Sequence, residues 1–279
     1  MRYIMKDSSI LFALIAVLGC VALTTGCASS SRLSQPVAVP EIRPGVPAGY
    51  LPPKALPNSL VLLPPPPAAG SAALAYDEEI NRKALTLRDT PRWTLANEDA
   101  NTTFPHVADT FSCALNAQIT EQDTPHLYML LRRTLMDAAT STNMAKDHYH
   151  RLRPLYVNKE PICPSDEGKS YIKAGSYPSG HTALGWAWAL ILSEISPEQA
   201  DAILGRGLTF GESRVICNAH WQSDVIGGFL MGAATVARLH ADPTFRADLE
   251  AAKAELAAVR AKGLKPQRDC AAEAAAMAK

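Results

Sequence analysis

One segment, from Gly180 to Glu194, constrains the fold more than any other. Read as a helix, it is apolar on almost every face rather than along one stripe. Such a helix has to be buried on all sides, because any exposed face would present hydrophobic side chains to water. The sequence therefore predicts a core assembled around this helix. Its large apolar residues are Leu184, Trp186, Trp188, Leu190, Ile191 and Leu192.

Five further segments carry helical periodicity or helix-start signals. Thr124 precedes Pro125, which is the order of an N-cap followed by proline at the first helical position. Ser196, Pro197 and Gln199 have the spacing of a capping box. No segment alternates apolar and polar residues as a strand would, so we predict an all-α, single-domain fold over residues 58–262. The expected helices are 71–87, 125–140, 197–210, 220–239 and one that begins at Asp242-Pro243.

Helix 220–239 contains Gly227, Gly228 and Gly232, and small residues of this kind let two helices approach closely. The spacing of Gly228 and Gly232 is also that of a membrane-helix dimer. The apolar stretch is too short for a membrane span and begins beside His220 and Asp224, so we expect packing in the core.

The ends of the chain are expected to lie outside the helical domain. Residues 1–27 have the basic start and apolar run of a signal peptide. Cys27 follows Thr25-Gly26 in a segment that resembles the lipobox of bacterial lipoproteins, with ordinary cleavage after Ala28 as the alternative. Both alternatives place the chain in the periplasm, and acylation of Cys27 would anchor it to the outer membrane. Residues 28–57 are Pro-rich and predict a linker, and residues 263–279 predict a flexible tail.

Three short clusters carry the chemical signal. Each is weak when taken alone, because a single basic residue or histidine is usually a surface or packing residue. The clusters are Lys146 with Arg153-Pro154, then Pro178-Ser179-Gly180-His181, and then Ser213-Arg214 with His220 and Asp224.

Taken together, the basic residues of these clusters describe an anion site. Lys146, Arg153 and Arg214 supply three cations, and guanidinium groups can engage a tetrahedral oxyanion through two hydrogen bonds each. Ser179 and Gly180 precede the buried helix, whose N-terminal backbone N–H groups and dipole also favour an anion.

The acidic and histidine residues add a reactive group to this site. His220 and Asp224 are four residues apart and lie on one helical face. The carboxylate can therefore hold one imidazole nitrogen and leave the other free as a nucleophile. His181 supplies a proton donor for a leaving group.

The patterns K-x6-R-P, P-S-G-H and S-R-x5-H-x3-D resemble the three motifs of the type 2 phosphatidic acid phosphatase superfamily and match them without a departure. The surrounding segments, 175–182 and 211–224, are similar to those of the soluble class A bacterial non-specific acid phosphatases. The likeness runs from the prolines at 64–67 to about Lys262, whereas the Pro-rich linker and the lipid anchor depart from the family.

This resemblance implies an all-helical fold of the acid phosphatase kind. It also implies hydrolysis of phosphate monoesters through a phosphohistidine, with no metal and no other cofactor. In that reaction His220 would attack phosphorus, Asp224 would orient His220, and His181 would protonate the leaving alcohol. The residues expected to bind the phosphoryl oxygens are Lys146, Arg153, Ser179, Gly180 and Arg214.

The motifs are expected to meet at one phosphate site, and this predicts which cysteines lie close together. Cys163 follows the first motif and Cys217 lies inside the third, so we expect a Cys163–Cys217 disulfide. Cys113 and Cys270 complete the set available to the fold, and an exported chain favours disulfides. Structural zinc is not expected, because the chain has no C-x-x-C pair.

Three other functions share the motifs. Vanadium haloperoxidases use the same cationic cage for vanadate but are usually longer. A second alternative is a membrane-tethered lipid phosphatase of the superfamily, although such enzymes usually carry several transmembrane helices. A third is a non-catalytic phosphate-binding protein, which would not need the catalytic residues that this sequence has at every motif position.

The expected partners are small-molecule phosphate monoesters. The 27 basic and 27 acidic residues cancel to a net charge of zero, which excludes a general electrostatic attraction to nucleic acid polymers. The sequence leaves open whether the chain is a monomer or a homo-oligomer.

Overall fold

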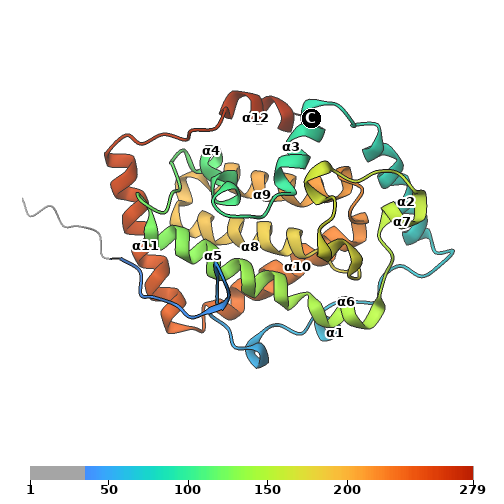
Figure 1. The fold of residues 1–279 in the computed structure, drawn as a ribbon, viewed down its shortest axis with the longest axis horizontal. Coiled ribbons are helices and arrows are strands. Elements are labelled where there is room, and N and C mark those ends of the chain that lie inside the picture. The colour runs from blue at the N-terminus through green and yellow to red at the C-terminus, as the bar shows by residue number, and fades with distance from the viewer. Residues whose placement is uncertain (1–34, 279) are drawn as a thin grey trace, which may run out of the picture. The chain divides into compact units, whose positions relative to one another are not determined.

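The computed structural model describes residues 35–278, and helices make up most of the regular structure of this unit. The signal peptide and the lipidation site at Cys27 were predicted in a segment that lies outside the described residues. At the centre of the unit is α8 (Gly180–Ile195), which packs against α5 (Pro125–Ser141), α9 (Ala200–Ile216), α10 (Gln222–Leu239) and α11 (Pro243–Ala261), as Figure 1 shows. Trp188, Ile191 and Leu192 of α8 are fully buried. The prediction of a core assembled around this segment is confirmed.

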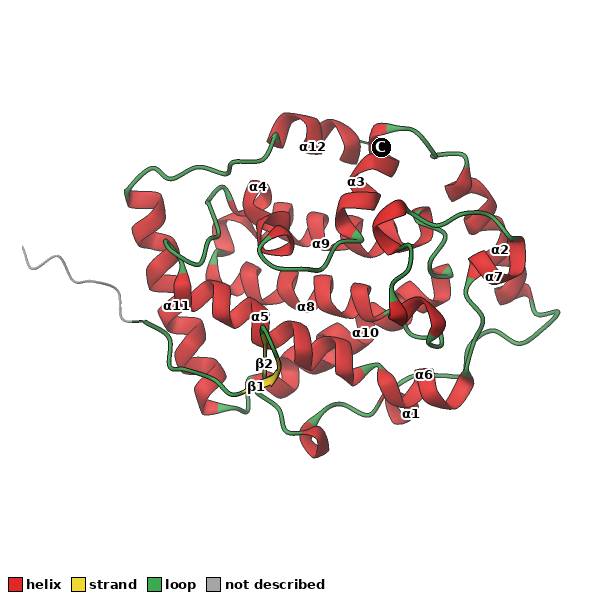
Figure 2. Ribbon diagram, in the orientation of Figure 1, coloured by secondary structure: helices red, strands yellow, loops and turns green. Residues whose placement is uncertain are grey.

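Shorter helices surround this group and form most of the remaining structure (Figure 2). The α-helices are α1 (Ser59–Leu62), α2 (Ala72–Leu85), α3 (Pro91–Asp99), α4 (Ser112–Leu115), α6 (Asn143–Tyr149), α7 (Pro154–Asn158) and α12 (Cys270–Met277). The 3-10 turns are η1 (Pro53–Ala55), η2 (His106–Phe111), η3 (Pro164–Asp166), η4 (Ser170–Lys173) and η5 (Pro197–Gln199).

Two glycines of α10 allow its close contact with α8. A Cβ atom at Gly228 would stand 2.7 Å from the carbonyl oxygen of Ser179, and one at Gly232 would stand 2.6 Å from that of Ala183. Neither position can hold a side chain unless the backbones separate. This contact brings the start of α10 next to the start of α8, where two of the three motifs lie. Within the described residues, no helix is both long and apolar enough to cross a membrane.

Two of the predicted helix starts differ from the structure in how they are capped. The predicted start of α5 at Pro125 is confirmed, but its cap is not the hydroxyl of Thr124. Thr124 stands at the N-cap position of α5, but its hydroxyl donates to the carbonyl oxygen of Thr120 at 2.9 Å. The carboxylate of Glu255 on α11 caps this helix instead, accepting from the backbone N–H groups of His126 and Leu127 at 2.9 Å each. A carboxylate in this position satisfies unpaired N–H groups and complements the helix dipole.

The predicted capping box at Ser196 does not form. The segment after Ser196 is the 3-10 turn η5, and α9 begins only at Ala200 and continues to Ile216. The hydroxyl of Ser196 instead donates to the side chains of Glu198 and Gln199. Arg260 of α11 contacts the same three side chains, so a tertiary contact replaces the local cap.

Both flanking segments pack on the helical unit, which differs from the expectation of a linker and a tail. In residues 35–57, β1 (Glu41–Arg43) and β2 (Val46–Pro47) form a short antiparallel hairpin. The backbone N–H groups of Tyr50 and Leu51 donate to the carboxylate of Asp137 on α5, at 2.8 and 3.0 Å. In residues 263–278, α12 packs on α3 and is joined to α4 by the Cys113–Cys270 disulfide.

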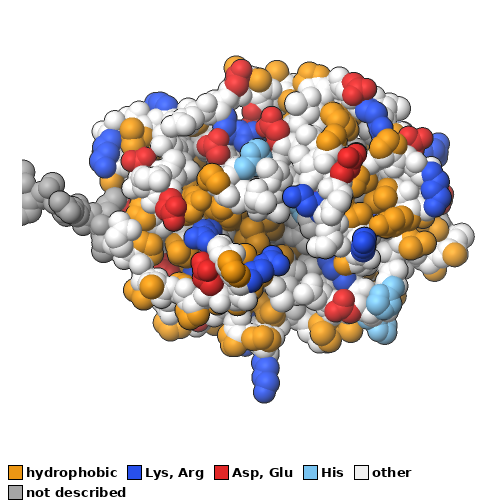
Figure 3. All heavy atoms as spheres, viewed as in Figure 1, with side chains coloured by type: hydrophobic (Ala, Val, Ile, Leu, Met, Phe, Trp, Pro, Cys, Tyr) orange, Lys and Arg blue, Asp and Glu red, His pale blue; other side chains and the backbone are white. Residues whose placement is uncertain are grey.

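The second disulfide joins Cys163 and Cys217, as predicted. It ties the loop after α7 to the end of α9. On the face in Figure 3, basic and acidic side chains are interspersed, and neither charge forms a continuous patch.

The Cys113–Cys270 bond closes 157 residues, and its loss is expected to destabilise the protein. We expect the Cys113→Ser/Cys270→Ser variant to lose up to about 5 kcal/mol in free energy of unfolding, from chain entropy alone. Reversible denaturant unfolding checks this value. Catalytic constants should not change, because α12 carries none of the motif residues. An unchanged unfolding midpoint would show that this disulfide contributes nothing to the stability of the unit.

Candidate active site

The three motifs meet at the ends of five helices. Lys146 is in the last turn of α6 and Arg153 is the N-cap of α7. Ser179, Gly180 and His181 form the start of α8. Arg214 is in the last turn of α9, and His220 and Asp224 lie before and within the first turn of α10. The structure therefore brings together the residues that the sequence singled out.

His220 is held from both sides and is almost fully buried. Its Nδ1 lies 3.3 Å from Oδ2 of Asp224, and a guanidinium nitrogen of Arg153 lies 2.8 Å from its Nε2. A guanidinium can only donate, so Nε2 carries the lone pair and Nδ1 carries the proton. Burial, followed by the charge of Arg153, holds the pKa of His220 well below its usual range. The ring is thus a neutral imidazole with its unprotonated nitrogen on the side of the arginine.

Arg214 is fully buried and only partly hydrogen-bonded. Its Nη2 donates to Asp166 of η3 at 2.7 Å. Its Nε and Nη1 are buried and have no hydrogen-bond partner within the described part of the chain. Unsatisfied donors of this kind are costly inside a protein, and a bound oxyanion would satisfy them.

Lys146 lies beneath the loop that precedes α8. Its Nζ donates to the carbonyl oxygens of Gly175 and Pro178, which shapes the turn that leads into Ser179. Burial, with a further contribution from Arg153, lowers the pKa of Lys146 to about 7. A neighbouring anion would raise that pKa and favour the charged ammonium.

Ser179 is committed to the local fold through several of its atoms. Its Oγ accepts from the backbone N–H and the hydroxyl of Thr182, at 3.2 and 2.9 Å. Its own N–H donates to the carbonyl oxygen of Asp224 at 2.9 Å. This last bond ties the start of α8 to the start of α10. The hydroxyl of Ser179 accepts in both of its hydrogen bonds with Thr182, so neither of them uses its proton.

His181 is only partly buried, and its Nε2 lies 3.3 Å from the carbonyl oxygen of Ala100 at the end of α3. Burial, followed by the charge of Arg214, lowers the pKa of His181 to about 3. Both histidines are therefore neutral before an anion binds.

Sequence reasoning missed the residues that support this site from behind. Asp166 pairs with Arg214, and Arg151 pairs with both Asp77 and Asp224. The only local signal was the R-x-R spacing of Arg151 and Arg153. Asp77 and Asp166 are distant in sequence from their partners, so spacing gave no sign of either.

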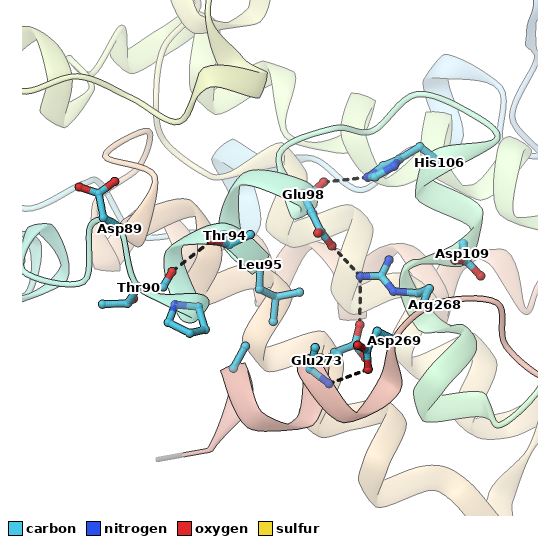
Figure 4. Close-up of a pocket in the computed structure, with 13 residues that line it drawn as sticks. Asp89, Thr90, Thr94, Leu95, Glu98, His106, Asp109, Arg268, Asp269 and Glu273 are labelled. Carbon is cyan, nitrogen blue, oxygen red and sulfur yellow. Dashed lines mark hydrogen bonds and ion pairs between the residues drawn. The ribbon is translucent and has the colours of Figure 1, made fainter.

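The structure also describes a cavity of about 680 Å³ between α3, η2 and α12, away from the motifs (Figure 4). Arg268 stands inside it and pairs with Glu98 and Glu273, at 2.9 and 3.2 Å. No motif residue lines this cavity.

Among residues 35–278, no three His, Cys, Asp or Glu side chains lie together in an arrangement suited to a metal ion.

Comparison with known proteins places the chain in a family. Residues 126–247 match the PAP2 superfamily, a range that includes every motif residue. The chain is 43% identical over 212 residues to a non-specific acid phosphatase of Providencia stuartii, covering 76% of this chain and 86% of that protein. The chain belongs to the bacterial non-specific acid phosphatases of the PAP2 superfamily.

Other members of this acid phosphatase family give the same picture. An acid phosphatase of Zymomonas mobilis is 37% identical over 240 residues, covering 86% of this chain and 89% of that protein. A non-specific acid phosphatase of Salmonella typhimurium is 42% identical over 205 residues, covering 73% and 82%. The all-α fold agrees with membership of this family.

Proposed function

We propose that this protein is an exported acid phosphatase that hydrolyses phosphate monoesters through a phosphohistidine at His220, without a metal ion. The observation that carries the proposal is Arg214, whose Nε and Nη1 are buried and find no partner among residues 35–278. The backbone of Arg214 contacts His220, a neutral histidine whose Nε2 carries no proton. A phosphoryl group seated between them would satisfy the arginine and face the nucleophile.

Binding is assigned to the groups that surround this space. Arg153 and Arg214 bind phosphoryl oxygens through their guanidinium groups, and Lys146 adds a third positive charge. The hydroxyl of Ser179 and the backbone N–H of Gly180 complete the set at the start of α8. These groups provide the positioning and charge stabilisation on which phosphoryl transfer depends.

The reaction then takes two steps. Nε2 of His220 forms a bond to phosphorus while the bond from phosphorus to the ester oxygen breaks, and His181 gives a proton to that oxygen. Water next attacks the phosphohistidine and returns a proton to His181, and the phosphorus–nitrogen bond breaks to release inorganic phosphate. Asp224 holds Nδ1 of His220 throughout and stabilises the charge that develops on the ring.

The charge state of His181 depends on the bound substrate. Its pKa is lowered to about 3 because burial and Arg214 oppose protonation. A bound phosphate dianion cancels that cationic field and raises the pKa of His181. The acid is therefore formed when substrate binds.

Export is supported by the cysteines and by the start of the sequence. Two disulfides, Cys113–Cys270 and Cys163–Cys217, are typical of proteins that work in oxidising compartments. The signal-like segment ahead of Cys27 agrees with a periplasmic enzyme, held at the outer membrane when that cysteine is acylated.

Metal independence can be tested by measuring phosphatase activity after chelation and in the presence of vanadate. Activity on a phosphate monoester should be unchanged after dialysis against EDTA, because Lys146, Arg153 and Arg214 already balance the charge of the phosphate. Vanadate resembles the five-coordinate transition state and should bind at least about a hundredfold more tightly than phosphate. A zinc-dependent phosphatase in the same buffers is the control for chelation. Recovery of activity only on addition of metal would reject the proposal.

A further inference from the structure

The carboxylate of Asp224 is held by more than its histidine. Oδ2 faces Nδ1 of His220 and also accepts from the backbone N–H of Trp221, at 2.9 Å. Oδ1 accepts from Nη1 of Arg151 at 2.7 Å. Each oxygen therefore has its own partner, and the arginine determines which oxygen points at the imidazole.

Arg151 is in turn fixed by a second carboxylate. Its Nη2 donates to Oδ2 of Asp77 on α2 at 2.7 Å, while Nη1 also donates to the hydroxyl of Ser223. Oδ1 of Asp77 accepts from the backbone N–H of Ser223 at 2.7 Å. The guanidinium also lies over the ring of Trp221, 5.5 Å from its centroid. Arg151 is thus clamped between α2 and the start of α10.

This cluster is buried, unlike an ordinary surface ion pair. The side chain of Arg151 is 10% exposed and that of Asp77 is 1% exposed. Surface pairs contribute little, whereas breaking a buried pair leaves a charge without compensation. Asp77 also lies outside residues 126–247, the range that matches the PAP2 superfamily.

We propose that Arg151, held in place by Asp77, is a positioning residue that fixes Asp224 so that Oδ2 faces His220. This makes α2 part of the catalytic unit, although it carries none of the motifs. The proposal rests on the function proposed above, because the dyad has to be catalytic for its support to affect turnover.

The charges around Asp224 show why the arginine is needed. Burial raises the pKa of Asp224, and Arg151 is the largest opposing influence. The other charged or titratable groups that face it are Lys146, His220 and the phenol of Tyr177. Without Arg151, the carboxyl would take up a proton at a higher pH, and Oδ1 would lose the contact that holds it.

A direct role of Arg151 in phosphate binding predicts a different result. Nη1 and Nη2 already donate to Asp224, Ser223 and Asp77. A positioning residue should therefore affect kcat and leave phosphate affinity unchanged, whereas a binding residue should raise KM.

A double-mutant cycle on the full-length enzyme separates these roles. Arg151→Gln alone should lower kcat by about ten- to a hundredfold, as expected when the partner of an orienting group is lost. In the Asp224→Asn background the same change should have almost no further effect, because the residue on which it acts is gone. The acid limb of the kcat profile of Arg151→Gln should move to higher pH, and Asp77→Asn should give a smaller change of the same kind.

The matched control is Arg133→Gln. Arg133 also pairs with an aspartate, Asp248, and stacks on an aromatic ring, that of Tyr50, but it is remote from the motifs. This variant should retain the kcat and the pH profile of the parent enzyme. If Arg151→Gln fails to fold, Arg151→Lys and Asp77→Asn enter the cycle in its place.

Two outcomes would overturn the proposal. In the first, the losses of kcat in Arg151→Gln and Asp224→Asn add up in the double variant. In the second, Arg151→Gln has an unchanged kcat but a raised KM and weaker inhibition by inorganic phosphate. Trapping of labelled phosphate on His220 of the parent enzyme is measured in parallel. Its absence would reject the proposed function, whereas an additive loss with the label still on His220 would reject only the role of Arg151.

Discussion

Replacement of His220 by alanine is expected to reduce phosphate-monoester hydrolysis to the background rate. In the proposed mechanism the variant loses the nitrogen that attacks phosphorus, and loss of a covalent nucleophile costs at least about ten-thousandfold in kcat. Asp224→Asn should lose less, because the imidazole remains and is only misplaced. Steady-state kinetics on the purified variants checks both values.

Rapid-quench trapping with radiolabelled substrate tests the covalent step directly. The parent enzyme should carry label on one histidine, and the His220→Ala variant should carry none. His240→Gln is a suitable control, because His240 pairs with Glu194 at the far end of α10. Label on Ser179 or Asp224 would show that the mechanism proposed here is wrong.

Local patterns were enough to predict the motif residues that the structure brings together at the helix ends. The order of Pro178, Ser179, Gly180 and His181 predicts a helix start, and the spacing of His220 and Asp224 predicts their contact. Both relations span only a few residues, so local sequence is enough to indicate them. The expected shared helical face is wrong, because α10 begins at Gln222 and His220 lies before it. The apolar faces of α8 are likewise visible in one short segment.

Contacts between distant segments could not be predicted in this way. Glu255 caps α5 from α11, so a rule limited to the residues around Thr124 selects the wrong cap. An aspartate such as Asp77 on a polar helix face usually contacts solvent, and nothing local marks its pairing with Arg151. The residues that support the site, Asp77, Arg151 and Asp166, are held by contacts of this kind, which local sequence patterns do not reveal.

The same limit applies to the ends of the chain. An Ala-rich segment after Pro266 lacks the apolar stripe that usually anchors a helix. α12 is instead held by Cys270 and by Glu273, which pairs with Arg268 and the buried Arg206. A disulfide and ion pairs across the fold replace the missing hydrophobic face.

The second large effect is expected for His181→Asn, and it should depend on the leaving group. An alkoxide is a poor leaving group and needs a proton, so kcat for alkyl phosphates should fall by about a hundred- to ten-thousandfold. The p-nitrophenolate group leaves almost without help, so kcat for p-nitrophenyl phosphate should fall far less. Paired kinetics on the two substrates measures the ratio.

The pH dependence follows from the opposite states that the two histidines must adopt. His220 has to be neutral, and a pKa well below its usual range keeps it so as the pH falls. His181 has to be protonated, so kcat should fall as the pH rises through the pKa that bound phosphate gives it. The kcat profile should be bell-shaped with an optimum on the acid side of neutral, and the alkaline limb should disappear in His181→Asn. Equal losses on both substrates, with the alkaline limb retained and chemistry rate-limiting, would reduce His181 to a phosphate-binding group.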